Sequence, residues 1–161
     1  MIAPVTPCQT KGPAMSFVQS ETDLYGLLAR AGEVQTWAPG GVVFERGSHG
    51  DVMYVVVTGT VALKDDENVL DTVHAPGIFG ELALIESKPR ALTAVAETEV
   101  GLVEIPVRTF WVLVHETPYF AQLVMRVMAE RLRNATGSGP GGASALAVDR
   151  RRAVGPRRLL A

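Results

Sequence analysis

The segment from Phe79 to Val95, FGELALIESKPRALTAV, places a short helical pattern inside an otherwise β-like sequence. Residues 79–85 favour a helical turn, and the Ser-Lys-Pro sequence at 87–89 ends it before the next β-like run. A helix between strands breaks the local rhythm of a β fold, and such departures are expected at functional sites. This segment is therefore the first candidate for the functional part of the chain.

Short runs rich in valine lie on both sides of this segment, separated by turn residues. They predict strands at residues 34–37, 42–45, 52–57, 60–64, 69–73, 93–97 and 101–105. Strands that recur every 8–12 residues or so, with turns between them, are typical of a sandwich or barrel. The run Val55–Val57 does not alternate with polar residues, which predicts a strand buried on both faces.

Helical patterns flank the strands. Apolar residues recur at helical spacing within residues 16–31. After the strands, a helix is predicted over residues 107–114, and Pro118 opens a longer one with Thr117 as the expected N-cap. The predicted fold is mainly β with flanking α: an antiparallel, jelly-roll-like β-roll with an N-terminal helix, a short inserted helix and two C-terminal helices.

Composition divides the 161-residue chain into three parts. Residues 1–15 contain three prolines and predict a disordered leader, residues 16–136 the folded domain, and residues 137–161 a flexible Gly-rich and basic tail. Subtracting the five arginines and one acid of the tail leaves 10 basic and 16 acidic residues in 1–136, a balance of −6. An acidic body argues against a nucleic-acid-binding surface.

The chain shows no sequence pattern for export or for crossing a membrane. Cys8 is the only cysteine, which excludes an internal disulfide and a cysteine-based metal site. There is no signal-peptide pattern and no run of about 18 apolar residues. These features predict a cytoplasmic protein without a membrane segment.

The residues around Gly80 have the chemistry of an anion site. Backbone N–H groups at the start of a helix are unpaired, and glycine lets an anion approach them closely. Arg90, which follows the rigid Pro89, can make charge-assisted contacts with phosphate oxygens. Ala83 and Ala91 are small and leave room for a ligand.

Glu81 requires a different partner, because a carboxylate beside a phosphate would repel it. It can accept a hydrogen bond from a neutral donor such as a ribose 2′-hydroxyl. A ligand with one negative charge and a hydroxyl close by satisfies both Glu81 and Arg90. A 3′,5′-cyclic nucleotide has this layout.

The run Phe79–Ile85, followed by Pro89, Arg90 and Ala91, closely resembles the phosphate-binding cassette of cyclic nucleotide-binding domains. That family includes the regulatory subunits of cAMP-dependent protein kinases and bacterial catabolite activator-type proteins. The spacing of nine residues from Glu81 to Arg90 matches the kinase-type cassette.

The resemblance extends beyond the cassette. Upstream, GSHGDVMYVV at residues 47–56, with Gly59, resembles the turn and strands of the same family. The similarity covers about residues 17–135, nearly all of the predicted domain.

The resemblance implies a role for each cassette residue. Glu81 would bind the ribose 2′-hydroxyl, Arg90 the exocyclic phosphate oxygens, and neighbouring backbone amides the rest of the phosphate. Leu82 would pack against the helices after the β-roll and couple occupancy to their position. The predicted ligand-binding residues are Gly80, Glu81, Leu82, Ala83, Arg90 and Ala91.

The choice of nucleotide depends on the two positions after the arginine. Family members with threonine directly after it favour cGMP, whereas this chain has Ala91, which implies cAMP, with cGMP as the alternative ligand. Many members carry a hydroxyl one place further on, where this chain has Leu92, so the purine preference stays open.

Two other classes of protein remain open. One is a domain of the same fold with an empty pocket that acts as a protein-interaction module, since a Glu–Arg pair in a loop is often only a surface salt bridge. The other is a small β-roll metalloenzyme, but His49, His74 and His115 are scattered and form no H-x-H pair. The common hydrolase and P-loop motifs are also missing, so we expect no catalysis, no metal and no cofactor besides the nucleotide ligand.

The expected function is that of a stand-alone regulatory module that binds a cyclic nucleotide and signals to an effector protein through movement of its C-terminal helices. Alternatively, the last helix forms the interface of a homodimer. Only about two dozen residues follow Gly137, too few for a helix-turn-helix domain, so we expect no direct DNA binding. Contact of Arg131, Arg133 or Thr136 with the purine is an alternative, but the sequence favours surface solvation for the two arginines.

Overall fold

The computed structural model describes residues 20–137. The expected leader 1–15 and residues 138–161 of the expected tail lie outside the described residues. In chain order, the helices and strands are α1 (Glu21–Leu28), β1 (Val34–Trp37), β2 (Val42–Phe44), β3 (Val52–Thr58), β4 (Thr60–Asp65), β5 (Asn68–His74), β6 (Gly77–Phe79), α2 (Glu81–Glu86), β7 (Thr93–Ala96), β8 (Val100–Pro106), α3 (Val107–Glu116) and α4 (Pro118–Ala135).

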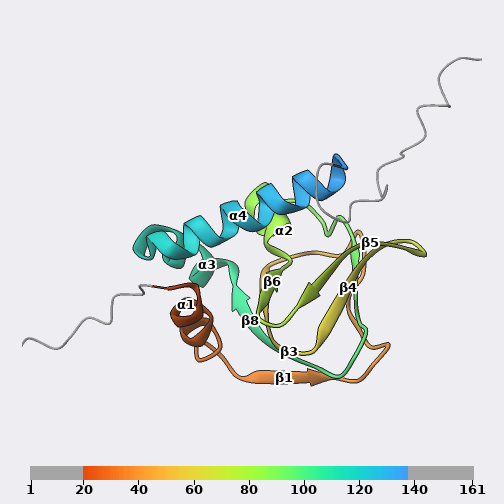
Figure 1. The fold of residues 1–161 in the computed structure, drawn as a ribbon, viewed down its shortest axis with the longest axis horizontal. Coiled ribbons are helices and arrows are strands. Elements are labelled where there is room, and N and C mark those ends of the chain that lie inside the picture. The colour runs from red at the N-terminus through yellow and green to blue at the C-terminus, as the bar shows by residue number, and fades with distance from the viewer. Residues whose placement is uncertain (1–19, 138–161) are drawn as a thin grey trace, which may run out of the picture.

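The strands form two four-stranded antiparallel sheets that face each other as a roll (Figure 1). One sheet has the order β1-β8-β3-β6, and the other has the order β2-β7-β4-β5. The chain crosses from the first sheet to the second at Gly59, between β3 and β4. The predicted β-roll with flanking helices is therefore confirmed.

Strand β3 is buried on both faces, as its valine run predicts. Tyr54 and Val56 point into the roll, where they pack with apolar side chains of both sheets. Met53 and Val55 point to the other face and pack with apolar residues of the helices. One strand thus separates two hydrophobic cores, one inside the roll and one under the helices.

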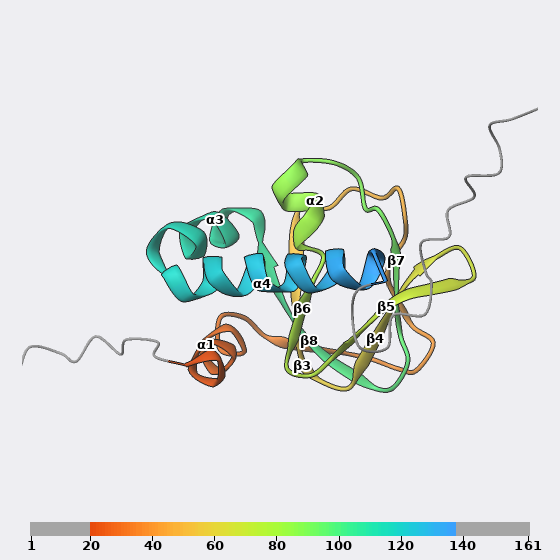
Figure 2. The ribbon, with the colours of Figure 1, turned by 45° about the horizontal axis from the view of Figure 1, so that its top comes forward.

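The helices cover the outer face of the first sheet. Ser20 caps α1 by accepting a hydrogen bond from the Asp23 amide, and α1 buries Leu24 in the helical core. Helix α4 begins beside α1 and α3 and ends near β5, as both ribbon views show (Figures 1 and 2). Among residues 20–137, no helix is both long enough and apolar enough to cross a membrane.

The predicted strands agree with the observed ones to within two residues at each end, but three local details differ. Residues 77–79 form β6, although no strand was predicted there and a helical turn was expected from residue 79, because Ile78 and Phe79 pair with β3. The inserted helix consequently starts at Glu81 rather than at residue 79. Thr117 occupies the N-cap position of α4, but its side chain makes no capping hydrogen bond.

Gly59 permits the crossing between the two sheets. Its φ is +83°, and a Cβ there would lie 2.2 Å from the carbonyl oxygen of Glu99. Gly40 has a similar φ of +82°, but nothing lies within 4 Å of its Cβ position.

We therefore expect Gly59→Ala to lower the free energy of unfolding by about 3 kcal/mol or more, and Gly40→Ala by only about 1 kcal/mol. Both variants carry the strain of a left-handed residue, whereas only the first adds a clash with the backbone. Urea unfolding of the two variants checks this. Equal losses would contradict the assigned role of Gly59.

Candidate functional site

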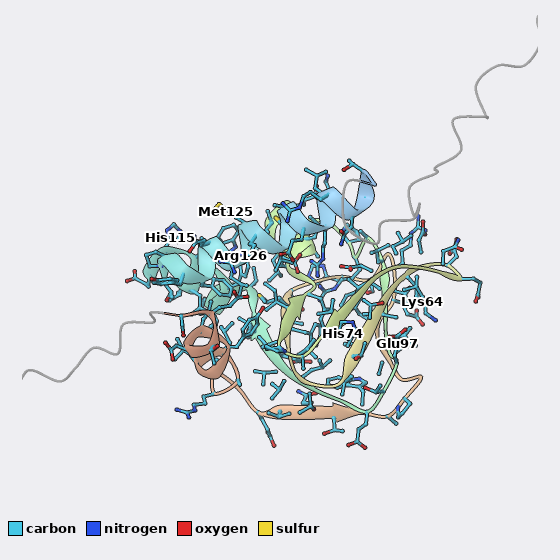
Figure 3. The ribbon with its side chains drawn as sticks, viewed as in Figure 1. Lys64, His74, Glu97, His115, Met125 and Arg126 are labelled. Atoms are coloured by element: carbon cyan, nitrogen blue, oxygen red, sulfur yellow. The ribbon has the colours of Figure 1, made fainter. Side chains whose placement is uncertain are left out.

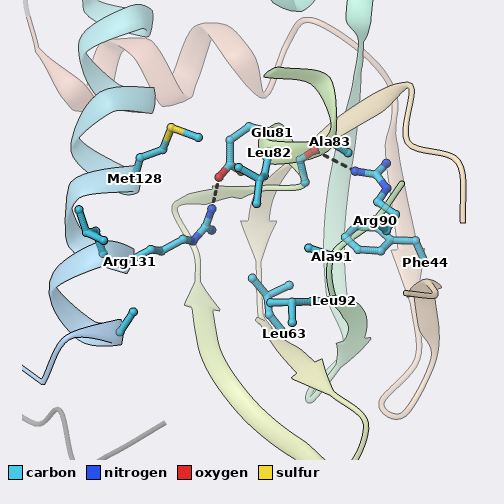
Figure 4. A pocket seen from close by; sticks show the side chains of 13 residues that line it. Phe44, Leu63, Glu81, Leu82, Ala83, Arg90, Ala91, Leu92, Met128 and Arg131 are labelled. Carbon is cyan, nitrogen blue, oxygen red and sulfur yellow. Dashed lines mark hydrogen bonds and ion pairs between the residues drawn. The ribbon is translucent and has the colours of Figure 1, made fainter. Parts of the chain in front are cut away.

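All six predicted site residues line one pocket of about 370 Å³, a size typical of small-molecule sites (Figure 4). The pocket lies between the segment from Gly80 to Leu92, strand β4 and the last turns of α4. The remaining lining residues, which the motif does not contain, are Phe44, Leu63, Leu92, Met128, Arg131, Leu132 and Ala135. Whether these residues bind a ligand stays a prediction.

Gly80 joins β6 to α2 in a conformation that favours glycine. Its φ is +82°, and it occupies the N-cap position of the six-residue helix α2. A Cβ at this position would lie 2.8 Å from Nη1 of Arg90. Glycine therefore provides both the sharp turn and the space that Arg90 fills.

Arg90 is a buried cation, only 4% exposed. Its Nη1 donates to the carbonyl of Gly80 at 2.8 Å and its Nη2 to the carbonyl of Val52 at 2.6 Å. The guanidinium lies 4.1 Å from the ring centroid of Phe44, at cation–π distance. Burial lowers the pKa of Arg90, although a guanidinium remains protonated in proteins.

The charge of Arg90 has no carboxylate partner among residues 20–137. The acceptors that hold its side chain are neutral carbonyls, and its buried Nε makes no hydrogen bond. A buried charge without a counter-charge is costly, so the site favours an anion that approaches this guanidinium.

Glu81 is even more deeply buried, at 1% exposure. Its Oε1 accepts a hydrogen bond from Nη1 of Arg131, whereas its Oε2 is buried without a partner. Burial raises the pKa of Glu81 above its ordinary value, and the charge of Arg131 opposes that rise. The sequence predicts Glu81 as an acceptor for a ligand hydroxyl, and in the structure one of its two oxygens is buried without a donor.

The expected surface solvation of Arg131 is wrong. Its guanidinium contacts Asp71, Glu81 and the carbonyl of Ile78, from three different elements. The helical spacing contained a signal for this position, since Arg131 follows Val124 and Met128 by seven and three residues, on the face that packs inward. Neither Arg133 nor Thr136 lines the pocket.

Apolar side chains form the wall of the pocket away from the two charges. Leu63 comes from β4, Leu92 from the segment before β7, and Met128 and Leu132 from α4. Leu82 is 40% exposed, so its expected packing against the later helices is limited to sharing this wall with α4. Apart from Leu82 and Leu92, these residues come from distant elements, which is why no local motif predicted them.

A metal centre finds no support in the part of the chain that the structure describes. No group of three or more His, Cys, Asp or Glu side chains lies there in positions that could hold an ion. His74 on β5 and His115 near the end of α3 are well separated (Figure 3).

The raised pKa of Glu81 predicts a pH dependence of stability. Because the folded state binds the proton more tightly than the unfolded state, ionisation of Glu81 destabilises the fold. Relative to Glu81→Gln, the natural protein should therefore lose stability as the pH rises above about 4.3, the ordinary value of a glutamate. The loss should level off above the folded-state pKa. Urea unfolding of both proteins between about pH 4 and 8 tests this, and a pH-independent difference would contradict it.

Two known proteins are similar to this chain over just over half of its length. A cyclic nucleotide-gated potassium channel of Rhizobium etli is 33% identical over 57% of this chain and 26% of its own length. A cAMP-dependent protein kinase regulatory subunit of Eremothecium gossypii is 33% identical over 62% of this chain and 22% of its own. The chain thus spans about a quarter of the length of these relatives.

A solved structure shares the fold over more of the chain. A protein described in connection with a cyclic-GMP-dependent signalling pathway of bacterial phytopathogenesis is 29% identical, with a TM-score of 0.60. The match covers 71% of this chain and 94% of that protein.

The family model for the cyclic nucleotide-binding domain matches residues 34–117, which is more than half of the chain. The matched residues include the β-roll, α2 and the two buried charged residues Glu81 and Arg90. The motif, the fold and this match agree, and the chain belongs to the cyclic nucleotide-binding domain family.

Proposed function

We propose that this chain binds a 3′,5′-cyclic nucleotide, with cAMP as the preferred ligand, in the pocket of Figure 4. The observation that carries the proposal is Arg90, a buried cation in the pocket wall with a free Nε and no carboxylate partner among the described residues. Nearby, the free oxygen of Glu81 supplies an acceptor for a neutral hydroxyl. A cyclic nucleotide offers one negative charge and one free hydroxyl on a single sugar ring.

The three parts of the ligand would occupy three parts of the pocket. The phosphate would lie at the start of α2, where the amides of Glu81, Leu82 and Ala83 open the helix and Arg90 is close. The ribose 2′-hydroxyl would donate to Glu81. The base would lie against the apolar wall that includes Leu63 and Leu92.

The preference for cAMP is supported by the chemistry of that wall. Both purines carry an amino group, but guanine also has a ring N–H and a carbonyl oxygen that need partners, and burying them unpaired costs free energy. The wall offers aliphatic side chains instead, and Ala91 has no hydroxyl. The names of the similar proteins do not favour one nucleotide, since the kinase subunit is cAMP-dependent and the phytopathogenesis protein is linked to cyclic GMP.

Regulation without catalysis is the second part of the proposal. Helix α4 supplies Met128, Arg131 and Leu132 to the pocket, so a ligand would contact that helix directly. We propose that occupancy shifts α4 and that an effector protein in the cytoplasm, rather than DNA, reads the shift. A homodimer through α4 is the alternative readout, and an empty pocket used only for protein interaction is the alternative function.

Calorimetric titration with cAMP and cGMP tests the binding proposal, with 5′-AMP as a control that lacks the cyclic phosphate. We expect cAMP to bind most tightly. If neither cyclic nucleotide shows binding when its concentration is raised well above micromolar, the proposal is wrong and the empty-pocket alternative is favoured.

Arg90→Ala should weaken cAMP binding by about 2–4 kcal/mol, because it removes charge-assisted contacts to the phosphate. Arg46→Ala is the matched control, since Arg46 is exposed, pairs with Asp65 and does not line the pocket. An affinity that is unchanged in Arg90→Ala, or reduced equally in both variants, would contradict the phosphate role of Arg90.

The choice between purines can be tested at Ala91. We expect Ala91→Thr to raise the affinity for cGMP roughly tenfold, about 1.4 kcal/mol, because its hydroxyl can pair with the guanine amino group. Ala91→Val has nearly the same shape without the hydroxyl and should give no such gain. A similar gain in both variants would show that shape, and not hydrogen bonding, sets the preference.

A further inference from the structure

The guanidinium of Arg90 lies over an aromatic ring that comes from β2, in the second sheet. Its central carbon, Cζ, is 4.1 Å from the ring centroid of Phe44 (Figure 4). The ring of Tyr54 is more distant, at 5.9 Å from the same carbon. The carbonyls of Gly80 and Val52 accept hydrogen bonds from the two Nη atoms. Two carbonyls and the Phe44 ring therefore set the position of this buried cation.

A bulge in β2 directs Phe44 toward the guanidinium. Val42 pairs with Val95 of β7. The next pair along is Phe44 with Ala94, so two steps along β2 match one step along β7. Successive side chains of a regular strand point to opposite faces, yet Val43 and Phe44 both pack against the core inside the roll. The extra residue thus turns Phe44 inward, where it joins the wall of the pocket.

Two further rings hold Phe44 in place. Its ring centroid is 5.8 Å from that of Phe79 and 5.9 Å from that of Tyr54, and those two rings are stacked at 5.1 Å. Phe79 and Tyr54 belong to strands of the first sheet and are almost fully buried. The position of the ring next to Arg90 is therefore determined by packing between the two sheets.

An aromatic ring stabilises a cation in a way that a carboxylate does not. The face of the ring carries partial negative charge and attracts the guanidinium, but the ring has no net charge. A carboxylate in the same place would neutralise Arg90 and repel an incoming phosphate. The Phe44 ring therefore offsets part of the free energy of burying the cation and leaves its charge available to an anion.

We propose that Phe44 is a positioning residue for recognition of the phosphate: its ring, turned inward by the bulge in β2, holds the Arg90 guanidinium in one orientation in the pocket wall. This inference rests on the proposed function, in which Arg90 binds the phosphate. It adds that the second sheet takes part in phosphate recognition, through a residue outside the segment from Gly80 to Ala91.

The two phosphorothioate diastereomers of cAMP test the orientation of Arg90, because sulfur replaces one or the other exocyclic oxygen and is a weaker acceptor. For the natural protein, calorimetry should give two affinities that differ roughly tenfold or more, the size of one charge-assisted hydrogen bond. In Phe44→Leu, a guanidinium that is free to turn can meet either oxygen, so the ratio of the two affinities should fall to roughly threefold or less. Phe44→Tyr keeps the ring and should keep the ratio.

A purely structural role for Phe44 predicts a different result. Loss of packing would weaken both diastereomers equally and keep the ratio in Phe44→Leu, which would overturn the inference. Trp37→Leu is the matched control, since Trp37 packs edge-on against Tyr54 but does not line the pocket. It should lower the stability of the fold and leave the ratio unchanged. An equal fall of the ratio in Trp37→Leu and Phe44→Leu would also overturn the inference.

The contact between the ring and the cation can be measured without any ligand. Urea unfolding of Phe44→Leu, Arg90→Met and the double variant gives the coupling between the two side chains. Phe44→Leu should lower the folding equilibrium constant roughly five- to thirtyfold more when Arg90 is present than in the Arg90→Met background, as expected for a cation–π contact shielded from water. Absence of coupling would overturn the inference.

The two measurements separate failure of this inference from failure of the proposed function. If the natural protein binds neither diastereomer although the coupling is present, the proposed function fails and the role in phosphate recognition fails with it. If the natural protein binds both diastereomers equally, binding of the nucleotide stands and the orienting role of Phe44 is wrong.

Discussion

Burial of β3 on both faces is the constraint on which the other parts of the structure depend. Its side chains alternate between the core of the roll and the core under the helices, so the strand cannot slip by one residue without exchanging both sets. Its neighbours β6 and β8 are held in register on either side. Because β6 ends at Phe79, the register of β3 determines where Gly80 and Glu81 lie. The carbonyl of Val52, at the start of β3, also holds Arg90.

The pocket contains two buried charges of opposite sign that are stabilised in different ways. Neutral carbonyls and an aromatic ring hold Arg90, which leaves its positive charge available to an anion. Glu81 is balanced by Arg131 through one oxygen only. An unpaired buried charge costs several kcal/mol, more than the roughly 1.5–3 kcal/mol of a hydrogen bond to a charged group. The two charges are therefore both a liability for the empty protein and a source of affinity for a ligand that complements them.

Helix α4 contributes to both chemical halves of the pocket. Met128 and Leu132 belong to the apolar wall, and Arg131 contacts the buried carboxylate of Glu81. These residues are on one helix that also packs against α1 and α3. A ligand that contacts the apolar wall and Glu81 would therefore act on α4 at both places. This is the physical basis for linking occupancy of the pocket to the position of α4.

Local sequence patterns were sufficient for most strands and for the β-roll, and they selected six cassette residues that all line one pocket, because alternation, turn residues and the Gly80–Arg90 motif operate over a few neighbours. They failed at β6, whose strand character comes from pairing with β3 rather than from its own three residues. They also failed for Arg131 and for the apolar wall, since these depend on contacts between residues up to about 60 positions apart. The sequence by itself determined the segment from Gly80 to Ala91 whose six predicted residues line the pocket. Only the tertiary structure decided that one oxygen of Glu81 pairs with Arg131 of α4 while the other is buried without a donor, because long-range packing sets which groups share a buried charge.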